Sequence, residues 1–137
     1  MKRYEYFEHT ADTGIRAFGD TPAKALENAA LGMLAVIYDT GSVKPEKLLK
    51  IELRREEEAD LIIAFLSELL YNFSVGKFMC CGVSVETLTE TRIIAYASGE
   101  IYDPGRHKIK GEIKTVTYHR FEFKKNGSCM LQVICDV

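Results

Sequence analysis

The sequence predicts an α+β fold in which two helices pack on one face of a mixed, largely antiparallel β-sheet. Apolar residues recur at helical spacing in two stretches, and short alternating apolar and polar runs, separated by turn residues, fill most of the remainder. Two strands come first, then a helix, a strand and a second helix, and four strands close the chain. With 137 residues and no linker or internal repeat, we expect one domain over residues 1–137.

The first third of the chain predicts a hairpin followed by a helix. Aromatic residues favour a strand at Tyr4–His9, and Ile15–Phe18 predicts a second one. Thr21 suits the N-cap of the helix, and Pro22 suits its first position because proline has no backbone donor to lose. The buried stripe of this helix is predicted to be Leu26, Ala29, Ala30, Met33 and Ile37.

A strand and a second helix follow. The alternation in Leu49–Arg54 predicts a strand with one wet face. The charged run Glu56–Glu58 suits a helix start, where negative charge complements the helix dipole. The buried stripe of the second helix is predicted to be Leu61, Phe65, Leu66, Leu69 and Phe73.

The last sixty residues predict four strands. Val83–Thr87 and Arg92–Tyr96 form one antiparallel pair. Val116–Phe123 and Cys129–Ile134 form the last hairpin, because the Asn126–Gly127 turn between them is a strong hairpin signal.

The composition argues against two kinds of partner. Lys plus Arg is 18 and Asp plus Glu is 20, giving a formal charge of -2 and a pI of about 5.9. Domains that bind nucleic acid tightly usually carry a basic excess, so we expect no direct high-affinity nucleic acid binding. No uninterrupted apolar run reaches the roughly 18 to 20 residues of a membrane helix, and no signal-like segment precedes the first strand. We therefore expect a cytoplasmic protein without a membrane partner.

The four cysteines predict neither a disulfide framework nor a zinc site. Cys80 and Cys81 are adjacent, Cys129 begins the last predicted strand, and Cys135 directly follows that strand. No C-x₂-C spacing occurs. Buried, inert thiols are the simplest interpretation.

No recognisable catalytic motif appears: the nucleophile elbow, the P-loop, the H-E-x-x-H pair and the dinucleotide fingerprint are all missing from the sequence. A Ser/His/Asp arrangement stays open, but no residues in the sequence single one out. The remaining polar candidates are His9, Asp12, His107, Lys114, His119 and Asp136.

Each candidate also has an ordinary structural interpretation. His107 stands among basic residues, which predicts a solvated histidine. His9 could cap a turn, and the alternation around His119 predicts a core or edge position. A lone lysine such as Lys114 usually faces water, and Asp12 could form a turn with its own backbone.

The end of the chain carries the most specific chemical pattern. Asp136 and the terminal carboxylate of Val137 are two anions close together, and they raise each other's proton affinity unless a cation compensates them. If Asp12 lies nearby, three carboxylates could surround a hard metal ion. The alternative is that Asp136 frays into water with the chain end. A terminal strand that is predicted to be ordered through Ile134 weakens the fraying interpretation.

Four segments in this order resemble the archease family. They are Tyr4–Asp12 (YEYFEHTAD), Ala17–Thr21 (AFGDT), Glu112–His119 (EIKTVTYH) and Ile134–Val137 (ICDV). The resemblance spans nearly the whole chain. Thr13 departs from the aliphatic residue that the family pattern carries there, and this leaves the proposed ligand set intact.

The resemblance implies a non-catalytic activator of the RtcB-type RNA ligase, which joins tRNA exon halves during tRNA splicing and depends on GTP and a divalent metal. Family members promote guanylylation of the ligase and so its multiple turnover. The family's metal site falls on Asp12, Asp136 and the carboxylate of Val137, with calcium as the usual ion and magnesium or manganese as alternatives. Its activating lysine falls on Lys114.

His119 and His9 also match family motif positions and are assigned to partner activation with Lys114. A second role implied by the resemblance is that of a chaperone or modulator of a tRNA-modifying enzyme such as a tRNA methyltransferase. A stand-alone metal-dependent hydrolase is a distant third interpretation.

Overall fold

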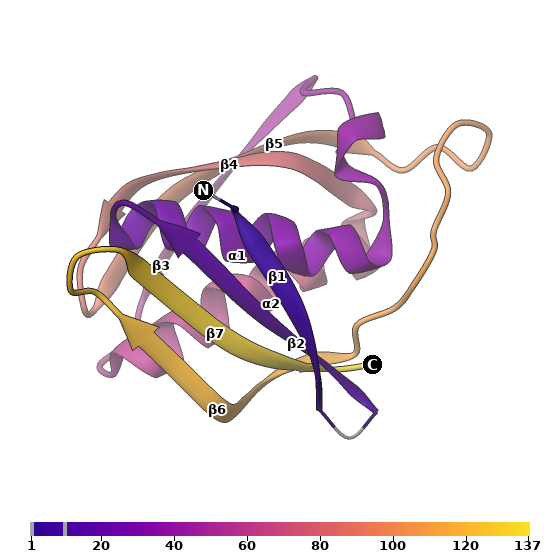
Figure 1. The fold of residues 1–137 in the computed structure, drawn as a ribbon. Coiled ribbons are helices and arrows are strands. Elements are labelled where there is room, and N and C mark those ends of the chain that lie inside the picture. Colours follow the sequence, from indigo (N-terminus) through magenta and orange to yellow (C-terminus); the bar gives the residue numbers. More distant parts are fainter. Residues whose placement is uncertain (1, 10) are drawn as a thin grey trace.

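The structure is a computed structural model that describes residues 2–9 and 11–137, without the side chain of His9. Within these ranges the chain forms seven strands, two α-helices and a short 3₁₀ helix, so the predicted α+β class is confirmed (Figure 1). The elements are β1 (Tyr4–His9), β2 (Asp12–Gly19), α1 (Pro22–Ile37), η1 (Thr40–Ser42), β3 (Lys47–Arg54), α2 (Glu58–Gly76), β4 (Phe78–Leu88), β5 (Arg92–Ile101), β6 (Thr115–Lys124) and β7 (Cys129–Asp136).

The strands divide into two sheets in place of the single mixed sheet that we expected. One sheet has the order β1-β2-β7-β6 and the other the order β3-β5-β4. Every strand pairing in the described part of the chain is antiparallel. Alternation along a strand reveals its wet face but not its partner, which is why the division was not predicted. The long connection from β5 to β6 carries the chain from one sheet to the other.

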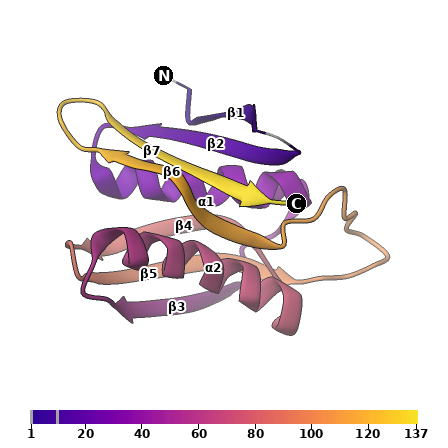
Figure 2. The same ribbon diagram turned by 90° about the horizontal axis from the view of Figure 1, so that it is seen from below.

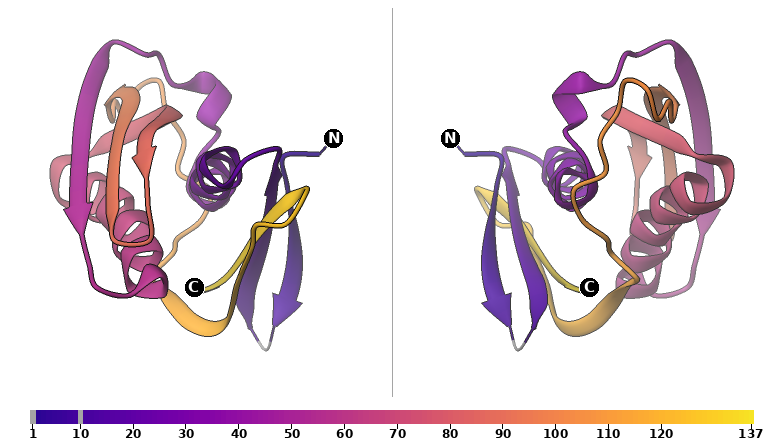
Figure 3. Two further views of the ribbon diagram at one scale, coloured as in Figure 1. Left: turned by 90° about the vertical axis from the view of Figure 1, so that its left-hand side faces the viewer. Right: turned by 90° about the vertical axis from the view of Figure 1, so that its right-hand side faces the viewer.

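Helix α1 lies between the two sheets. It packs against β2 and β7 of the four-stranded sheet and against β4 of the three-stranded sheet. Viewed nearly end-on in Figure 3, the helix has one sheet on either side. Its small side chains Ala25, Ala29 and Ala30 are fully buried, which allows this close approach. As predicted, Thr21 caps the helix, and its hydroxyl accepts a hydrogen bond from the Lys24 N–H at 3.1 Å.

Helix α2 packs along the three-stranded sheet and reaches β6 of the other sheet (Figure 2). Glu58 and Asp60 lie in its first turn, as the charged run predicted. By length and composition alone, α2 could cross a membrane. A helix in a protein core has the same composition, and one face of α2 belongs to the core. The buried residues of this face are Leu61, Ile62, Ile63, Phe65, Leu66 and Leu69.

The four cysteines are all free thiols. Cys80, Cys129 and Cys135 are buried, and Cys81 is half-buried. Burial raises the pKa of the Cys80 thiol to about 12, which keeps it protonated at neutral pH. The prediction of buried thiols is therefore confirmed for three of the four.

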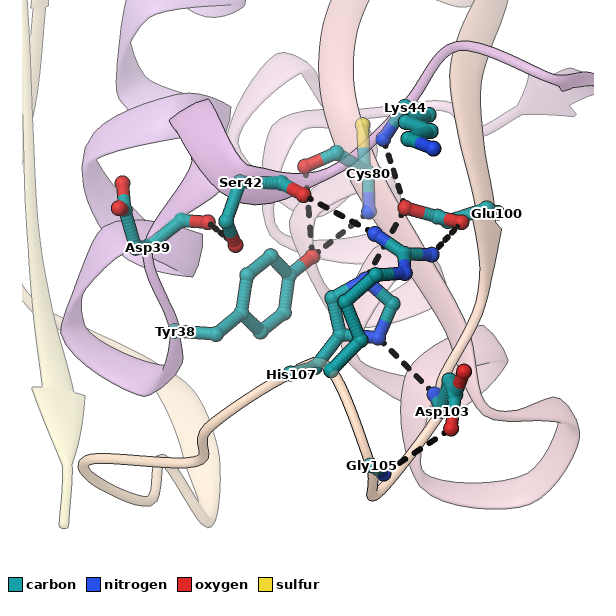
Figure 4. A network of polar contacts seen from close by, with 10 residues as sticks. Tyr38, Asp39, Ser42, Lys44, Cys80, Glu100, Asp103, Gly105 and His107 are labelled. Carbon is teal, nitrogen blue, oxygen red and sulfur yellow. Dashed lines mark hydrogen bonds and ion pairs between the residues drawn. The ribbon is translucent and has the colours of Figure 1, made fainter.

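The connection between β5 and β6 is fixed by a buried polar network (Figure 4). The Glu100 carboxylate is 4% exposed and accepts hydrogen bonds from Arg106, from the Lys44 N–H at 2.7 Å and from Nε2 of His107 at 3.0 Å. Nδ1 of His107 accepts from the Asp103 N–H at 2.9 Å, so the proton of the neutral ring is on Nε2.

The prediction of a solvated His107 is wrong, because the residue is only 3% exposed. The basic neighbours in sequence pointed to a polar loop. Glu100, which compensates for burial of the ring, precedes His107 by seven positions and belongs to β5. The network fixes the first part of the connection. Further along the connection, the Lys110 N–H donates a hydrogen bond to the Ile37 carbonyl at 2.8 Å.

The Glu100 network predicts a loss of stability in acid. The Arg106 guanidinium, and next the Lys44 N–H, lower the pKa of Glu100 from 4.5 to about 2. Because the carboxylate is favoured in the folded state, its contribution is full above about pH 4.5 and is lost as the pH falls towards 2. We expect urea unfolding from pH 6 to 2 to show this loss in the native chain and a smaller loss in Glu100→Gln.

The matched control is Glu52→Gln. Arg92 lowers the pKa of Glu52 as well, but this pair is exposed, so its effect on the pH dependence is expected to be smaller. An identical acid profile for Glu100→Gln and the native chain would contradict the assignment of this loss to Glu100.

Candidate functional site

Asp12 and Asp136 lie at the same end of the central strand pair of the four-stranded sheet. Asp12 is the first residue of β2, and Asp136 is the last residue of β7. The pairing of these antiparallel strands runs from Gly19 opposite Cys129 to Thr13 opposite Cys135. One step further, the same register puts Asp12 across from Asp136. Directly opposed residues in an antiparallel pair have Cβ atoms about 4.5–5.5 Å apart.

The two carboxylates share the outer face of the sheet. Gly14 pairs with Ile134, and side chains two positions apart on a strand point to the same side. Cys135 points the other way, into the core beneath α1. Burial and then the negative charge of Asp12 raise the pKa of the Cys135 thiol to about 12. This electrostatic influence is a second sign that Asp12 lies at the end of β7.

The chain end is anchored up to its penultimate residue. Asp136 pairs with Thr115 of β6, and its carbonyl accepts a hydrogen bond from the Lys114 N–H at 2.8 Å. Val137 follows directly and is 40% exposed. In Figure 1 the chain end lies near the end of the sheet where the β1–β2 hairpin turns. Fraying of Asp136 into water, the alternative interpretation of the terminus, is therefore not what the structure shows.

The residues at this end of the sheet fit a hard cation. The donor set consists of two half-buried side-chain carboxylates and a terminal carboxylate, which are the oxygen ligands that calcium and magnesium prefer. Among the described residues, no group of three or more His, Cys, Asp or Glu side chains could hold a metal ion. Oxygen donors of this kind disfavour soft metals such as zinc.

A surface cavity borders Asp12, one of the two carboxylates. It has a volume of about 360 Å³, and Asp12 and Thr13 form part of its wall. The remaining lining residues are Tyr6, Phe7, Glu8 and Val36.

The backbone of Lys114 is hydrogen-bonded to that of Asp136, and Lys114 also lines a second cavity. Its side chain is exposed, as predicted for a lone lysine. The cavity has a volume of about 260 Å³ and lies between the end of the β5–β6 connection and α2. Its other lining residues are Ser67, Leu70, Tyr71, Ser74, Ile113 and Thr115.

The two histidines matched to the family motifs differ in how far the structure describes them. The backbone of His9 pairs with Asp12 across the β1–β2 hairpin, while its side chain lies outside the described part. His119 is exposed within a bulge of β6, and its N–H donates to the Thr117 hydroxyl at 3.3 Å. Because β6 is an edge strand of its sheet, the structure confirms the edge position among the two predicted for His119, and the core position is wrong.

Two arginines on the same outer face were not singled out from the sequence. Arg16 lies four positions after Asp12 along β2, and side chains an even number of positions apart on a strand share a face. Strand alternation could therefore have indicated that the two are on the same side of the sheet. Arg120 could not have been found in this way, because the β6 bulge breaks the alternation before it.

Comparisons with known proteins give a consistent assignment. Residues 4–137 match the Archease protein family (MTH1598/TM1083). The chain is 41% identical to "Protein archease" of Methanosarcina acetivorans, with 99% of this chain and 97% of the relative covered. It is 35% identical to "Protein archease" of Thermococcus gammatolerans, with both chains covered completely.

Solved structures agree with these relatives. The solution structure of protein 1598 of Methanobacterium thermoautotrophicum superposes with a TM-score of 0.81 at 30% identity, with both chains covered completely. A crystal structure from Thermotoga maritima, described as an archease and possible chaperone, has a TM-score of 0.64 at 19% identity, covering 96% of this chain and 94% of the other. At that identity the second likeness concerns the fold alone. The family match and these relatives establish that the chain belongs to the archease family.

Proposed function

We propose that this protein is a non-catalytic activator of an RtcB-type RNA ligase, acting in the cytoplasm during tRNA splicing. It promotes guanylylation of the ligase and thereby multiple turnover. Membership of the archease family supports this role. The observation that carries the proposal is the pairing of β2 with β7, which brings Asp12 beside Asp136 and the chain end.

In this proposal a divalent cation, most simply calcium, is bound by Asp12, Asp136 and the terminal carboxylate of Val137. The cation would supply a positive charge with open positions for oxygen ligands. Asp136 is the fixed member of the set, because its backbone is held by Lys114 and Thr115. The half-buried position of both aspartates restricts their side chains, which lowers the entropy lost on binding.

Lys114 is the residue proposed to act on the ligase directly, with His119 and His9 as further contacts. The Lys114 side chain is exposed, while its N–H is tied to Asp136. A lysine held in this way can bring a cationic group to an anionic partner at a defined distance from the metal. The near-neutral charge of the chain agrees with a protein that engages the ligase and not its RNA.

The second candidate function is a chaperone or modulator of a tRNA-modifying enzyme such as a methyltransferase. It is favoured by exposed apolar side chains on α2 and on the β5–β6 connection, of which Tyr71 lines the same cavity as Lys114. Tyr71 is 58% exposed and Val75 is 64% exposed on α2, and Ile109 on the β5–β6 connection is 44% exposed. Such side chains suit contact with apolar surface on a client.

Calcium affinity tests the metal site. We expect Asp12→Ala and Asp136→Ala each to weaken calcium binding about tenfold or more in calorimetric titrations, because each removes a charged ligand. A peptide tag fused after Val137 should weaken binding as well, because it converts the terminal carboxylate into an amide.

Two controls isolate these effects. The same tag at the N-terminus should leave the affinity unchanged, and so should Glu86→Ala, which removes an exposed carboxylate from β4 of the other sheet. Unchanged calcium affinity with the C-terminal tag would remove Val137 from the ligand set.

A reconstituted ligation assay tests the activating role. With excess RNA over ligase, Asp12→Ala, Asp136→Ala and Lys114→Ala should each reduce stimulation of turnover about tenfold or more, the scale of one lost charged contact. Lys50→Ala, at an exposed position on β3, is the matched control and should stimulate normally. Full stimulation by all three site variants would reject the proposal.

The same variants separate the two candidate functions. If the protein suppresses aggregation of unrelated clients and Asp12→Ala suppresses it equally well, the chaperone function is favoured. Loss of ligase stimulation without any change in aggregation favours the activator.

A further inference from the structure

Two arginine guanidinium groups lie against one phenylalanine ring on the outer face of the four-stranded sheet. The guanidinium carbon of Arg16 is 4.2 Å from the centroid of the Phe7 ring, and that of Arg120 is 5.7 Å from the same centroid. Both cations are attracted to the ring, but they also repel each other. The ring itself covers Gly14, where a Cβ atom would come within 2.3 Å of it.

A buried glutamine fixes both arginines. Gln132 is 2% exposed, and its Oε1 accepts a hydrogen bond from Nε of Arg16 at 2.8 Å. Its Nε2 donates to the Arg120 carbonyl at 2.9 Å. One amide therefore positions the side chain of one arginine and the backbone of the other. Burying a polar amide costs free energy unless both of its ends are hydrogen-bonded, and here both are.

The backbone at Arg120 adopts an unusual conformation. Between Thr117, which pairs with Ile134, and Glu122, which pairs with Gln132, residues 118–121 of β6 lie opposite Val133 alone. Arg120 lies within this bulge with φ of 54°, in the left-handed region that residues other than glycine rarely adopt. Strain of this kind persists only where surrounding contacts hold it, and it often marks a functional position.

The positive charge of the two arginines is only partly compensated. Nη1 of Arg16 lies 3.4 Å from the Glu5 carboxylate, longer than the roughly 2.7–2.9 Å of a strong charge-assisted bond. Nη2 of Arg16 and the Arg120 guanidinium have no ion-pair or hydrogen-bond partner within the described part of the chain. Arg120 is exposed and Arg16 is half-buried, so an external anion can reach these donors.

We propose that Arg16 and Arg120 form a binding site for the phosphate groups of a compact polyphosphate ligand. Guanidinium groups match phosphate oxygens through paired N–H donors. The Phe7 ring, Gln132 and the β6 bulge position the two arginines before any ligand binds. An anion between them would also relieve their mutual repulsion. The site requires neither a metal ion nor a ligase, so it goes beyond the activator function proposed above.

The surroundings favour a compact ligand over a nucleic acid strand. A strand needs a row of cations along its path. Here the same face carries Glu5 beside Arg16, and Asp12 and Asp136 lie towards the end of the strands. These carboxylates would repel a phosphodiester backbone that extends across the sheet, whereas a short polyphosphate can stay between the arginines.

Binding of inorganic triphosphate to the full chain tests this proposal. In buffer containing EDTA, we expect calorimetry to give a dissociation constant of about 1 mM or tighter, and the affinity to fall as salt is added. Arg16→Ala and Arg120→Ala should each weaken binding about tenfold or more. Arg16→Lys and Arg120→Lys retain the charge but lose the paired donors, so they should weaken binding less.

Arg54→Ala removes an exposed arginine from β3 of the other sheet and is the matched control, expected to bind triphosphate like the native chain. Circular dichroism verifies that each variant is folded. The proposal is overturned if triphosphate does not bind at millimolar concentration, or if neither arginine substitution weakens it. A single-stranded RNA oligonucleotide that binds more tightly than triphosphate would overturn the assignment to a compact ligand.

Discussion

The antiparallel pairing of β2 with β7 is the constraint on which the rest of the structure depends. It joins residues separated by more than a hundred positions, and it forms the centre of the four-stranded sheet that covers α1. A shift of one residue in this register would turn the core face of β7 outward and would also separate Asp12 from Asp136. Stability and site geometry are therefore linked, because a one-residue shift that separates the two carboxylates would also turn Val133 out of the core.

The outer face of the same sheet carries two groups of opposite charge. Carboxylates gather where β2 begins and β7 ends, and the arginines lie further along, around Phe7. The sheet presents these groups at fixed positions because β2 and β7 are hydrogen-bonded to a neighbouring strand on both sides. The side chains of the inner face, in contrast, pack against α1. The polar groups of this sheet therefore lie on its outer face, where they are available for the binding proposed above, and the apolar side chains lie inside.

Sequence reasoning identified the helices, the strands and the family, because these depend on local patterns such as the Thr21–Pro22 cap and the Asn126–Gly127 turn. It did not identify the two sheets or the burial of His107, because both depend on where a long connection leads the chain. The charge of the terminus singled out Asp136 and the Val137 carboxylate, and the resemblance to the archease family added Asp12. The register of β2 and β7 agrees with a position of Asp12 beside Asp136. Arg120 was missed because a bulge has no periodic signature.

The most direct test of the carboxylate site is a crystal structure of the untagged chain grown with calcium and measured for anomalous scattering. The geometry predicts a calcium ion at the end of β2 and β7, with oxygens of Asp12, Asp136 and the Val137 terminus at about 2.3–2.6 Å. A fully ordered chain end without an ion there, or a calcium ion bound without Asp12, would contradict it.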